Sequence, residues 1–120
     1  MAGEIVRIEA LETYAPPGHS GTVNRRLVEG AATGGRFEMV HGRLEPGGVA
    51  DRHAHEVEYQ AMMVLAGACD VVLGDAAPVR AEAGAVVRIP PGTPHEVTSL
   101  GPEPLELIIV YSPPIARKDA

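Results

Sequence analysis

The chain has 120 residues and a mass of 12.6 kDa, which suffices for one domain with one hydrophobic core. Ten Lys and Arg residues against sixteen Asp and Glu residues give a formal net charge of −6, and there are only three Tyr, one Phe and no Trp. An acidic chain without a basic cluster binds nucleic acids and anionic membranes poorly. We therefore expect neither nucleic acid nor a membrane among its partners.

The apolar stretches are too short for a membrane-spanning helix. The longest run, residues 61–69, is well below the ~20 residues that cross a bilayer. The N-terminal segment carries acidic residues where a signal peptide would be basic. The single cysteine, Cys69, lies in an apolar run, so we expect a buried core residue and no disulfide. Together these features predict a cytoplasmic protein.

Fourteen Gly and eleven Pro residues divide the chain into short runs. No run has the length and periodicity of a helix, except for a single turn near residues 9–12. The turn signals are residues 45–48, 74–75, 84 and 90–92. The runs between them have strand length and cover residues 22–28, 36–44, 49–55, 59–66, 69–73, 79–83, 85–89, 94–100 and 105–111. This pattern predicts an all-β domain, either a sandwich or a closed barrel.

The two ends of the chain differ from its middle. Residues 1–20 contain one short apolar stretch and then the breaker Pro16-Pro17-Gly18, which indicates an N-terminal arm. Residues 113–120 begin with two prolines and indicate a C-terminal tail. We therefore expect the β-barrel domain to cover residues 21–112.

Three histidines and a glutamine form a candidate metal site. His53 and His55 are two residues apart on a predicted strand, so their side chains leave the same face with Cα atoms roughly 6.5 Å apart. His95 follows a rigid proline-rich turn, and Gln60 begins the next apolar run. Two imidazoles on one face, with a third from another strand, can bind one metal ion.

These residues also match a known pattern. The stretch from Gly47 through His53, His55 and Gln60 to Gly67 resembles the first motif of the cupin superfamily, with Gln in place of the usual Glu. The stretch containing Gly84, Pro90, Gly92, His95 and Ser99 resembles the second motif, with Ser in place of the usual Asn. The resemblance covers residues 35–111.

The resemblance to cupins has consequences for the fold and the site. It implies a double-stranded β-helix, or jelly-roll β-barrel, preceded here by the N-terminal arm. It also implies one divalent metal ion with His53, His55 and His95 as ligands. Gln60 occupies the position of the fourth ligand, and it either binds the ion through its amide oxygen or hydrogen-bonds a metal-bound water.

Exchanging a carboxylate for the neutral amide of Gln60 leaves the ion its full +2 charge. This favours anionic ligands and disfavours a trivalent metal. We therefore expect a metal-dependent enzyme, of isomerase, cyclase or lyase type, that uses the ion as a Lewis acid on a small anionic, enolisable or chelating substrate. The alternatives are a quercetinase-like dioxygenase and a non-catalytic metabolite-binding cupin. The donor set suits Zn, Fe, Ni, Co, Mn or Cu without choosing among them.

Candidate acid and base groups are few. If Phe37 and Met39 were buried, strand alternation would turn His41 into the cavity, and Glu58 lies two residues before Gln60 near its rim. We take His41 and Glu58 as the catalytic candidates. The alternatives are a partly exposed strand histidine and a solvated turn carboxylate. The same alternation places Met62 and Val64 inside with Gln60, and Val97 inside with His95. His19 is expected to be an exposed residue of the arm.

The short apolar stretch of the arm, residues 5–8, cannot form a stable strand alone. Addition to the sheet edge of a second copy would pair its backbone groups and cover that edge. We therefore expect a homodimer, with folding of the same arm onto its own barrel as the alternative.

Overall fold

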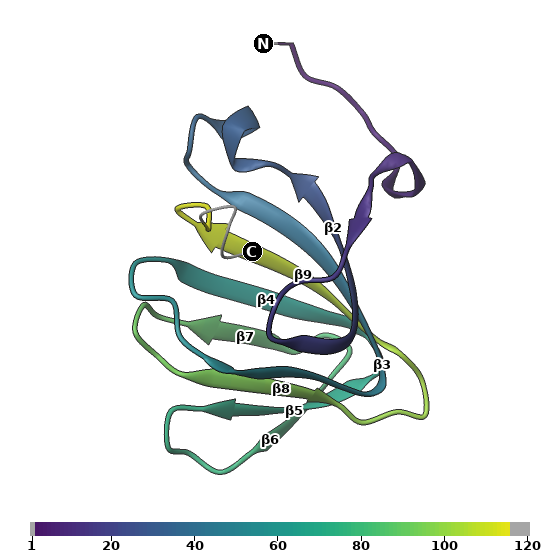
Figure 1. Cartoon of the computed structure of the whole chain (residues 1–120), viewed down its shortest axis with the longest axis vertical. Coiled ribbons are helices and arrows are strands. Elements are labelled where there is room, and N and C mark those ends of the chain that lie inside the picture. The colour runs from purple at the N-terminus through teal and green to yellow at the C-terminus, as the bar shows by residue number, and fades with distance from the viewer. Residues whose placement is uncertain (1, 116–120) are drawn as a thin grey trace.

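The computed structural model describes residues 2–115, which form strands joined by short turns (Figure 1). Two 3-10 helices, η1 (Ile8–Ala10) and η2 (Gly30–Thr33), are the only helical turns in this part of the chain. The strands are β1 (Thr13–Tyr14), β2 (His19–Val28), β3 (Glu38–His53), β4 (Tyr59–Ala66), β5 (Ala68–Leu73), β6 (Val79–Glu82), β7 (Val86–Ile89), β8 (His95–Ser99) and β9 (Leu105–Ser112). The all-β prediction is confirmed.

The strands form one antiparallel sheet that curls on itself in a jelly-roll arrangement (Figure 1). Its hydrogen-bonded order is β6-β5-β8-β3-β9-β4-β7, and β2 adds to β3 outside this path. Strands that lie far apart in the sequence are therefore neighbours in space. In particular, β3 lies beside β8, and these two strands carry the histidines of the candidate site.

The predicted turn at residues 45–48 is a bend inside β3 and not a reversal of the chain. The strand β2 pairs along both halves of β3, and its register steps from Ser20↔Val49 to Thr22↔Leu44 across the bend. A side chain at Gly48 would put its Cβ 2.9 Å from the carbonyl oxygens of Glu45 and Ser20, so the close approach requires glycine. The bend lets the first half of β3 pair with β9 and the second half with β8.

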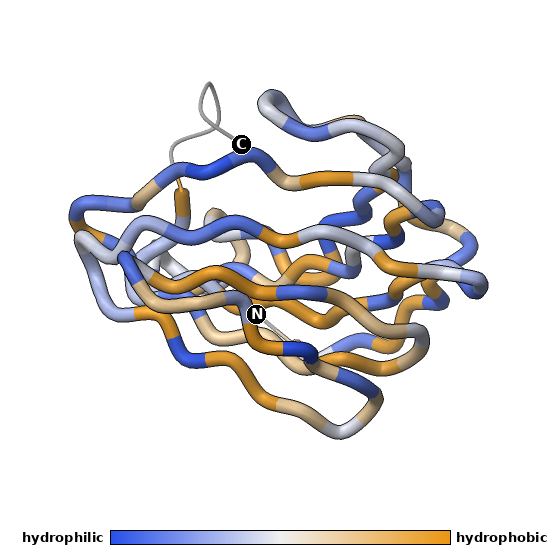
Figure 2. Tube along the Cα trace, turned by 90° about the horizontal axis from the view of Figure 1, so that it is seen from below, coloured by the Kyte–Doolittle hydropathy of each residue, from blue (hydrophilic) through white to orange (hydrophobic). Residues whose placement is uncertain are grey.

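Hydrophobic and hydrophilic residues follow one another along the strands (Figure 2), and burial alternates between a buried inner face and an outer face. The predicted inward positions of Met62, Val64 and Val97 are confirmed. Cys69 is fully buried, as predicted, and burial raises the pKa of its thiol to about 11. The core on the inner face consists mainly of Val40, Leu44, Ala50, Met62, Val64, Cys69, Val71, Ala81, Val87, Ile89, Val97, Leu105, Leu107 and Ile109.

The N-terminal segment reaches the barrel earlier than the predicted boundary suggests. The strand β1 pairs with β2, and β2 itself begins at His19 inside the predicted arm. Ahead of η1, Ile5 is 97% exposed and Val6 is 52% exposed. No helix within residues 2–115 is long and apolar enough to span a membrane.

The predicted C-terminal tail is described only as far as Ile115, so residues 116–120 lie outside the described part of the chain. Ile115 is buried against the barrel, and its backbone N–H donates a hydrogen bond of 3.2 Å to Oε1 of Glu38. Glu38 is itself only 1% exposed. This contact fastens the end of the described chain to the start of β3.

Candidate metal centre

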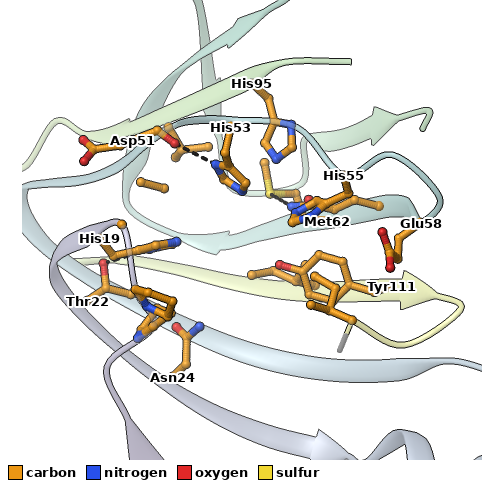
Figure 3. Close-up of a pocket in the computed structure, with 18 of the residues that line it drawn as sticks. His19, Thr22, Asn24, Asp51, His53, His55, Glu58, Met62, His95 and Tyr111 are labelled. Atoms are coloured by element: carbon orange, nitrogen blue, oxygen red, sulfur yellow. Dashed lines mark hydrogen bonds between the residues drawn. The ribbon is translucent and has the colours of Figure 1, made fainter. Parts of the chain in front are cut away.

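A cavity of about 570 Å³ lies on the inner side of the curled sheet. Its size falls within the range of small-molecule pockets in proteins. Most of its wall is apolar, and β3, β4, β8 and β9 contribute the aliphatic residues Leu44, Ala50, Met62, Val97, Leu107 and Ile109. Figure 3 shows His53, His55 and His95 close together in this cavity, with His19, Thr22 and Asn24 also among its polar lining.

The structure brings the three predicted histidines together. His53, the last residue of β3, is the cross-strand partner of His95, the first residue of β8. His55 follows two residues beyond the end of β3. One ring nitrogen from each residue lies within 4.8 Å of those of the other two, and the ring centroids of His53 and His95 are 4.3 Å apart. Three imidazole nitrogens at this spacing can hold one metal ion.

Backbone hydrogen bonds orient two of these rings. Nδ1 of His53 donates to the carbonyl of Asp51 at 2.6 Å, and Nδ1 of His95 donates to the carbonyl of Thr93 at 3.0 Å. Since a carbonyl only accepts, each Nδ1 carries the proton and each Nε2 has its lone pair available. The turn before β8 is tied to the same place, because the N–H of Gly92 donates to the carbonyl of His55 at 2.8 Å.

Two of the histidines have a buried Nε2 atom for which the described protein supplies no partner. Among the described residues, Nε2 of His55 and Nε2 of His95 are buried and lack a hydrogen-bond partner. Burial lowers the pKa of His95 to about 4 and also lowers that of His55, so both rings are neutral at pH 7. Neutral imidazoles with unsatisfied lone pairs are what a divalent metal ion requires.

Gln60 completes this set from β4. The side chain is 5% exposed and lines the same cavity, and its Nε2 donates to Sδ of Met62 at 3.7 Å. The amide nitrogen is therefore used by the sulfur. The amide oxygen, Oε1, is buried and has no partner among the described residues. An unsatisfied buried amide oxygen beside unsatisfied imidazoles fits a fourth metal ligand. The residues present therefore suit a divalent ion.

Comparisons with known proteins identify the family and the fold. Residues 40–111 match the family model described as the cupin domain. The chain belongs to the cupin family. A comparison with curated proteins found no match for this cupin.

Several solved structures share the fold. One is the polyketide cyclase RemF from Streptomyces resistomycificus, with 23% identity and a TM-score of 0.82 over 92% of this chain and 80% of that one. Another is KdgF from Halomonas sp., with 21% identity and a TM-score of 0.82 over 98% and 99% of the two chains. A predicted oxalate decarboxylase from Thermotoga maritima matches with 23% identity and a TM-score of 0.82, over 91% and 98%. At these identities the likeness establishes the fold.

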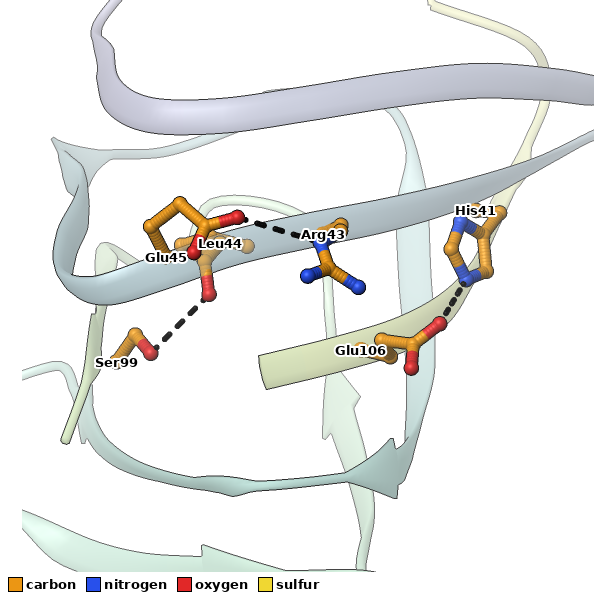
Figure 4. Close-up of polar contacts among 6 residues, drawn as sticks. All are labelled: His41, Arg43, Leu44, Glu45, Ser99 and Glu106. Carbon is orange, nitrogen blue, oxygen red and sulfur yellow. Dashed lines mark hydrogen bonds and ion pairs between the residues drawn. The ribbon is translucent and has the colours of Figure 1, made fainter. Parts of the chain in front are cut away.

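The two catalytic candidates are placed differently in this cupin. The expectation that His41 turns into the cavity is wrong. Its Nε2 lies 3.0 Å from Oε1 of Glu106 on the outer face of the sheet (Figure 4). Glu38 and Val40 are buried instead, so alternation turns His41 outward. The burial of Glu38 is compensated by a hydrogen bond that its carboxylate accepts from the backbone N–H of Ile115. Glu58, by contrast, lines the cavity and is partly buried.

A fourth histidine lines the cavity that sequence reasoning did not place there. His19 lies in β2 opposite Ala50 of β3, and its ring centroid is 6.3 Å from that of His53. The expectation of an exposed arm residue is therefore wrong. Thr22 and Asn24 line the same wall from the same strand and are both buried (Figure 3). The Pro16-Pro17-Gly18 turn was the available signal, since such a turn commonly delivers the chain into a strand.

The charged groups around the cavity are predominantly acidic. Among the described residues that line it, Arg52 is the only lysine or arginine, and it lies 3.9 Å from the carboxylate of Asp75. The acidic residues of the lining are Glu38, Asp51, Glu56 and Glu58. Negative charge on a ligand is therefore favoured only where a bound cation would offset it.

Proposed function

We propose that this cupin is an enzyme that holds one divalent metal ion through His53, His55, His95 and Gln60. It acts on a small enolisable or chelating substrate that binds as an anion, in a reaction of isomerase, cyclase or lyase type. The observation that carries the proposal is the convergence of buried, unpartnered Nε2 and Oε1 atoms in one cavity. A protein that used these groups only for packing would satisfy them with hydrogen bonds of its own.

The chemistry follows from the charge of the donor set. A divalent ion bound by neutral donors would act as a Lewis acid that stabilises negative charge on a substrate oxygen. The chain's own residues supply orientation and exclusion of water. The carbonyls of Asp51 and Thr93 hold two of the imidazoles in place, and the aliphatic wall formed by β4, β8 and β9 keeps bulk water from the reacting end.

The distribution of charge limits the substrate. Because the lining is acidic outside the histidine cluster, a polyanion would be repelled by most of the cavity. A substrate whose negative charge is confined to its chelating end, with an uncharged remainder, fits better. Hydroxyketones, β-diketones, hydroxy acids and catechol-like phenols have this form. The structurally similar RemF is described as a polyketide cyclase, which is compatible with a reaction of cyclase type.

Glu58 is the remaining acid–base candidate. It lies at the cavity, close enough to His55 to raise the pKa of that ring electrostatically, although burial and His53 outweigh this effect. We assign it the role of accepting or donating the proton at the substrate carbon. Glu58→Gln should reduce kcat by 10²-fold or more while leaving metal content unchanged. Glu103→Gln, at an exposed carboxylate outside the cavity lining, is the matched control.

The experiment that tests the function combines metal analysis with a substrate screen. The purified chain should hold close to one divalent ion, and loaded protein should convert at least one diketone, enol or catechol without consuming O₂. Turnover that requires O₂ would instead establish the quercetinase-like dioxygenase. A chain that binds these compounds without converting them would be a metabolite-binding cupin, and one that takes up no metal would refute the proposal.

We also propose that two copies associate through the N-terminal segment. Ile5 and Val6 are exposed ahead of η1, whereas the chain from Thr13 onward pairs with its own barrel. Two apolar side chains in solvent gain free energy from burial against a second copy. Light scattering should give a dimer mass at micromolar concentration, and Ile5→Asp together with Val6→Asp should give a monomer. A wild-type monomer mass would refute this assembly.

A further inference from the structure

Beside the histidine cluster, the cavity contains a further hydrogen-bonding group whose direction the structure defines. His19 enters the cavity from β2 (Figure 3), which pairs with β3 on the edge opposite β8. Its ring centroid is 6.3 Å from that of His53, whereas the clustered ligand atoms of His53, His55 and His95 lie within 4.8 Å of one another. His19 is thus near the proposed metal ligands but outside their cluster.

The neighbouring threonine determines which nitrogen of His19 carries the proton. The hydroxyl of Thr22 donates its single proton to the carbonyl of Ser20 at 3.2 Å. Its oxygen must therefore accept in the 3.3 Å contact with Nδ1 of His19. Nδ1 is then the protonated nitrogen, and Nε2 of His19 has a lone pair that can accept a hydrogen bond inside the cavity.

The rest of the lining favours the same kind of ligand. The carboxylates of the lining are also acceptors, and Arg52 is the one cationic side chain among the described lining residues. A cavity rich in acceptors is complemented by a ligand that donates, and a hydroxyl group is the uncharged donor of suitable size.

We propose that His19 is a specificity-determining residue that accepts a hydrogen bond from a substrate hydroxyl outside the chelating pair. The inference rests on the proposed function and narrows its substrate class to chelators with an additional hydroxyl donor, such as polyhydroxylated phenols. His19 and His53 line the same cavity with ring centroids 6.3 Å apart. A ligand that binds at the histidine cluster therefore lies beside His19.

Catechol and pyrogallol test this proposal, because they share a chelating pair and differ by one hydroxyl. Calorimetry with the zinc-loaded full-length chain, under anaerobic conditions, should show a preference for pyrogallol of roughly three- to tenfold, as expected for one net hydrogen bond. His19→Leu should abolish the preference while retaining zinc and catechol binding. His19→Gln, whose amide oxygen can still accept, should retain part of it.

Two further variants separate hydrogen bonding from structure. Thr22→Val removes the group that holds the proton on Nδ1, so the preference should fall without loss of zinc. His41→Leu changes a histidine on the outer face and should leave the preference intact. Equal preference in wild type and His19→Leu would overturn the inference while leaving the proposed function standing. Loss of zinc from His19→Leu would also overturn it, because His19 would then be a metal ligand. Failure of both phenols to bind the zinc-loaded chain would instead count against the proposed function.

Discussion

Two histidines on one strand have opposite environments. His41 and His53 both belong to β3, on either side of the bend at residues 45–48. His41 faces outward and is paired with the partly exposed carboxylate of Glu106, whereas His53 faces the cavity beside His55 and His95. The residue type is the same, so the difference comes from the side of the sheet and from the partner strand.

This contrast explains why one of them is a candidate ligand. The outer position meets β9, where a carboxylate satisfies the ring and water remains close. The inner position meets β8, where the cross-strand partner is another histidine and the rings leave buried nitrogens without partners. A histidine is suited to bind a metal when a backbone carbonyl accepts the proton of one ring nitrogen and the other nitrogen faces further metal-binding groups.

The largest difference is expected between variants that lack one histidine on either side of β3. His53→Ala should empty the site, because two imidazoles and an amide remain. If metal is present at about 1,000 times its dissociation constant, its loss removes roughly 4 kcal/mol of stability and lowers Tm by about 10–20 °C. His41→Ala should retain the metal and change Tm by only a few degrees. Metal analysis and calorimetry of both variants measure this, and equal metal content in the two would contradict the assignment.

Gln60 provides the next test, since the substitution Gln60→Glu adds a negative charge on the inner face alone. If Oε1 is a ligand, Gln60→Glu should bind the metal at least tenfold more tightly, because a carboxylate adds Coulomb attraction to the ion. The same change should weaken anionic chelators, because the charge of the ion and its ligands falls from +2 to +1. Competition titration with a chelator, together with catechol binding, measures both effects.

The outcomes of Gln60→Glu also separate the alternatives. A dioxygenase limited by electron donation from the metal should gain activity, because a carboxylate ligand favours the trivalent state. If Gln60 only packs in the core, the new carboxylate would be buried without a partner. The fold would then lose a few kcal/mol of stability and gain no metal affinity. Gln60→Glu with unchanged metal affinity and a lower Tm would thus refute ligation.

Much of the fold could be predicted because residues close together in the sequence determine most of its turns. Gly and Pro residues separate the strands, and alternation within Tyr59–Ala66 and His95–Ser99 predicted the inner face correctly. The bend at residues 45–48 could not be predicted in the same way. A Pro-Gly-Gly segment is compatible with a reversal or with a bend, and here the pairing with β2, which is distant in sequence, decides between them.

The site was predictable only where residue spacing is itself the signal. His53, His55 and His95 carry that signal in their spacing and in the proline-rich turn before β8. His41 was placed on the wrong face because the apolar Phe37 and Met39 suggested that their side was buried. Long-range contacts bury Glu38 instead. His19 was missed because only its pairing with Ala50 brings it inward.

In the metal-free protein, acid should lower the free energy of unfolding through the buried His95 on the inner face. Burial lowers the pKa of His95 from 6.5 to about 4, so the unfolded chain binds more protons than the folded chain between these values. Stability should therefore fall as the pH decreases through this range, by about 1–2 kcal/mol between pH 7 and pH 5 after allowance for solvent screening. Urea unfolding of chelator-treated protein measures the change. His95→Gln should flatten the profile, and an unchanged slope in that variant would contradict this origin.

The smallest effect is expected at the outer pair. Glu106 is about one-third exposed and His41 is mostly covered, so their 3.0 Å contact lies close to water. A double-mutant cycle with His41→Ala and Glu106→Gln should give a coupling energy of no more than about 1 kcal/mol, and added salt should reduce it. Neither change should alter the metal content, because the contact lies on the face of β3 that points away from the cavity. A coupling of several kcal/mol, or metal loss in either single variant, would mean that the two sides of β3 are not independent. In that case the outer histidine would support the site through the strand itself.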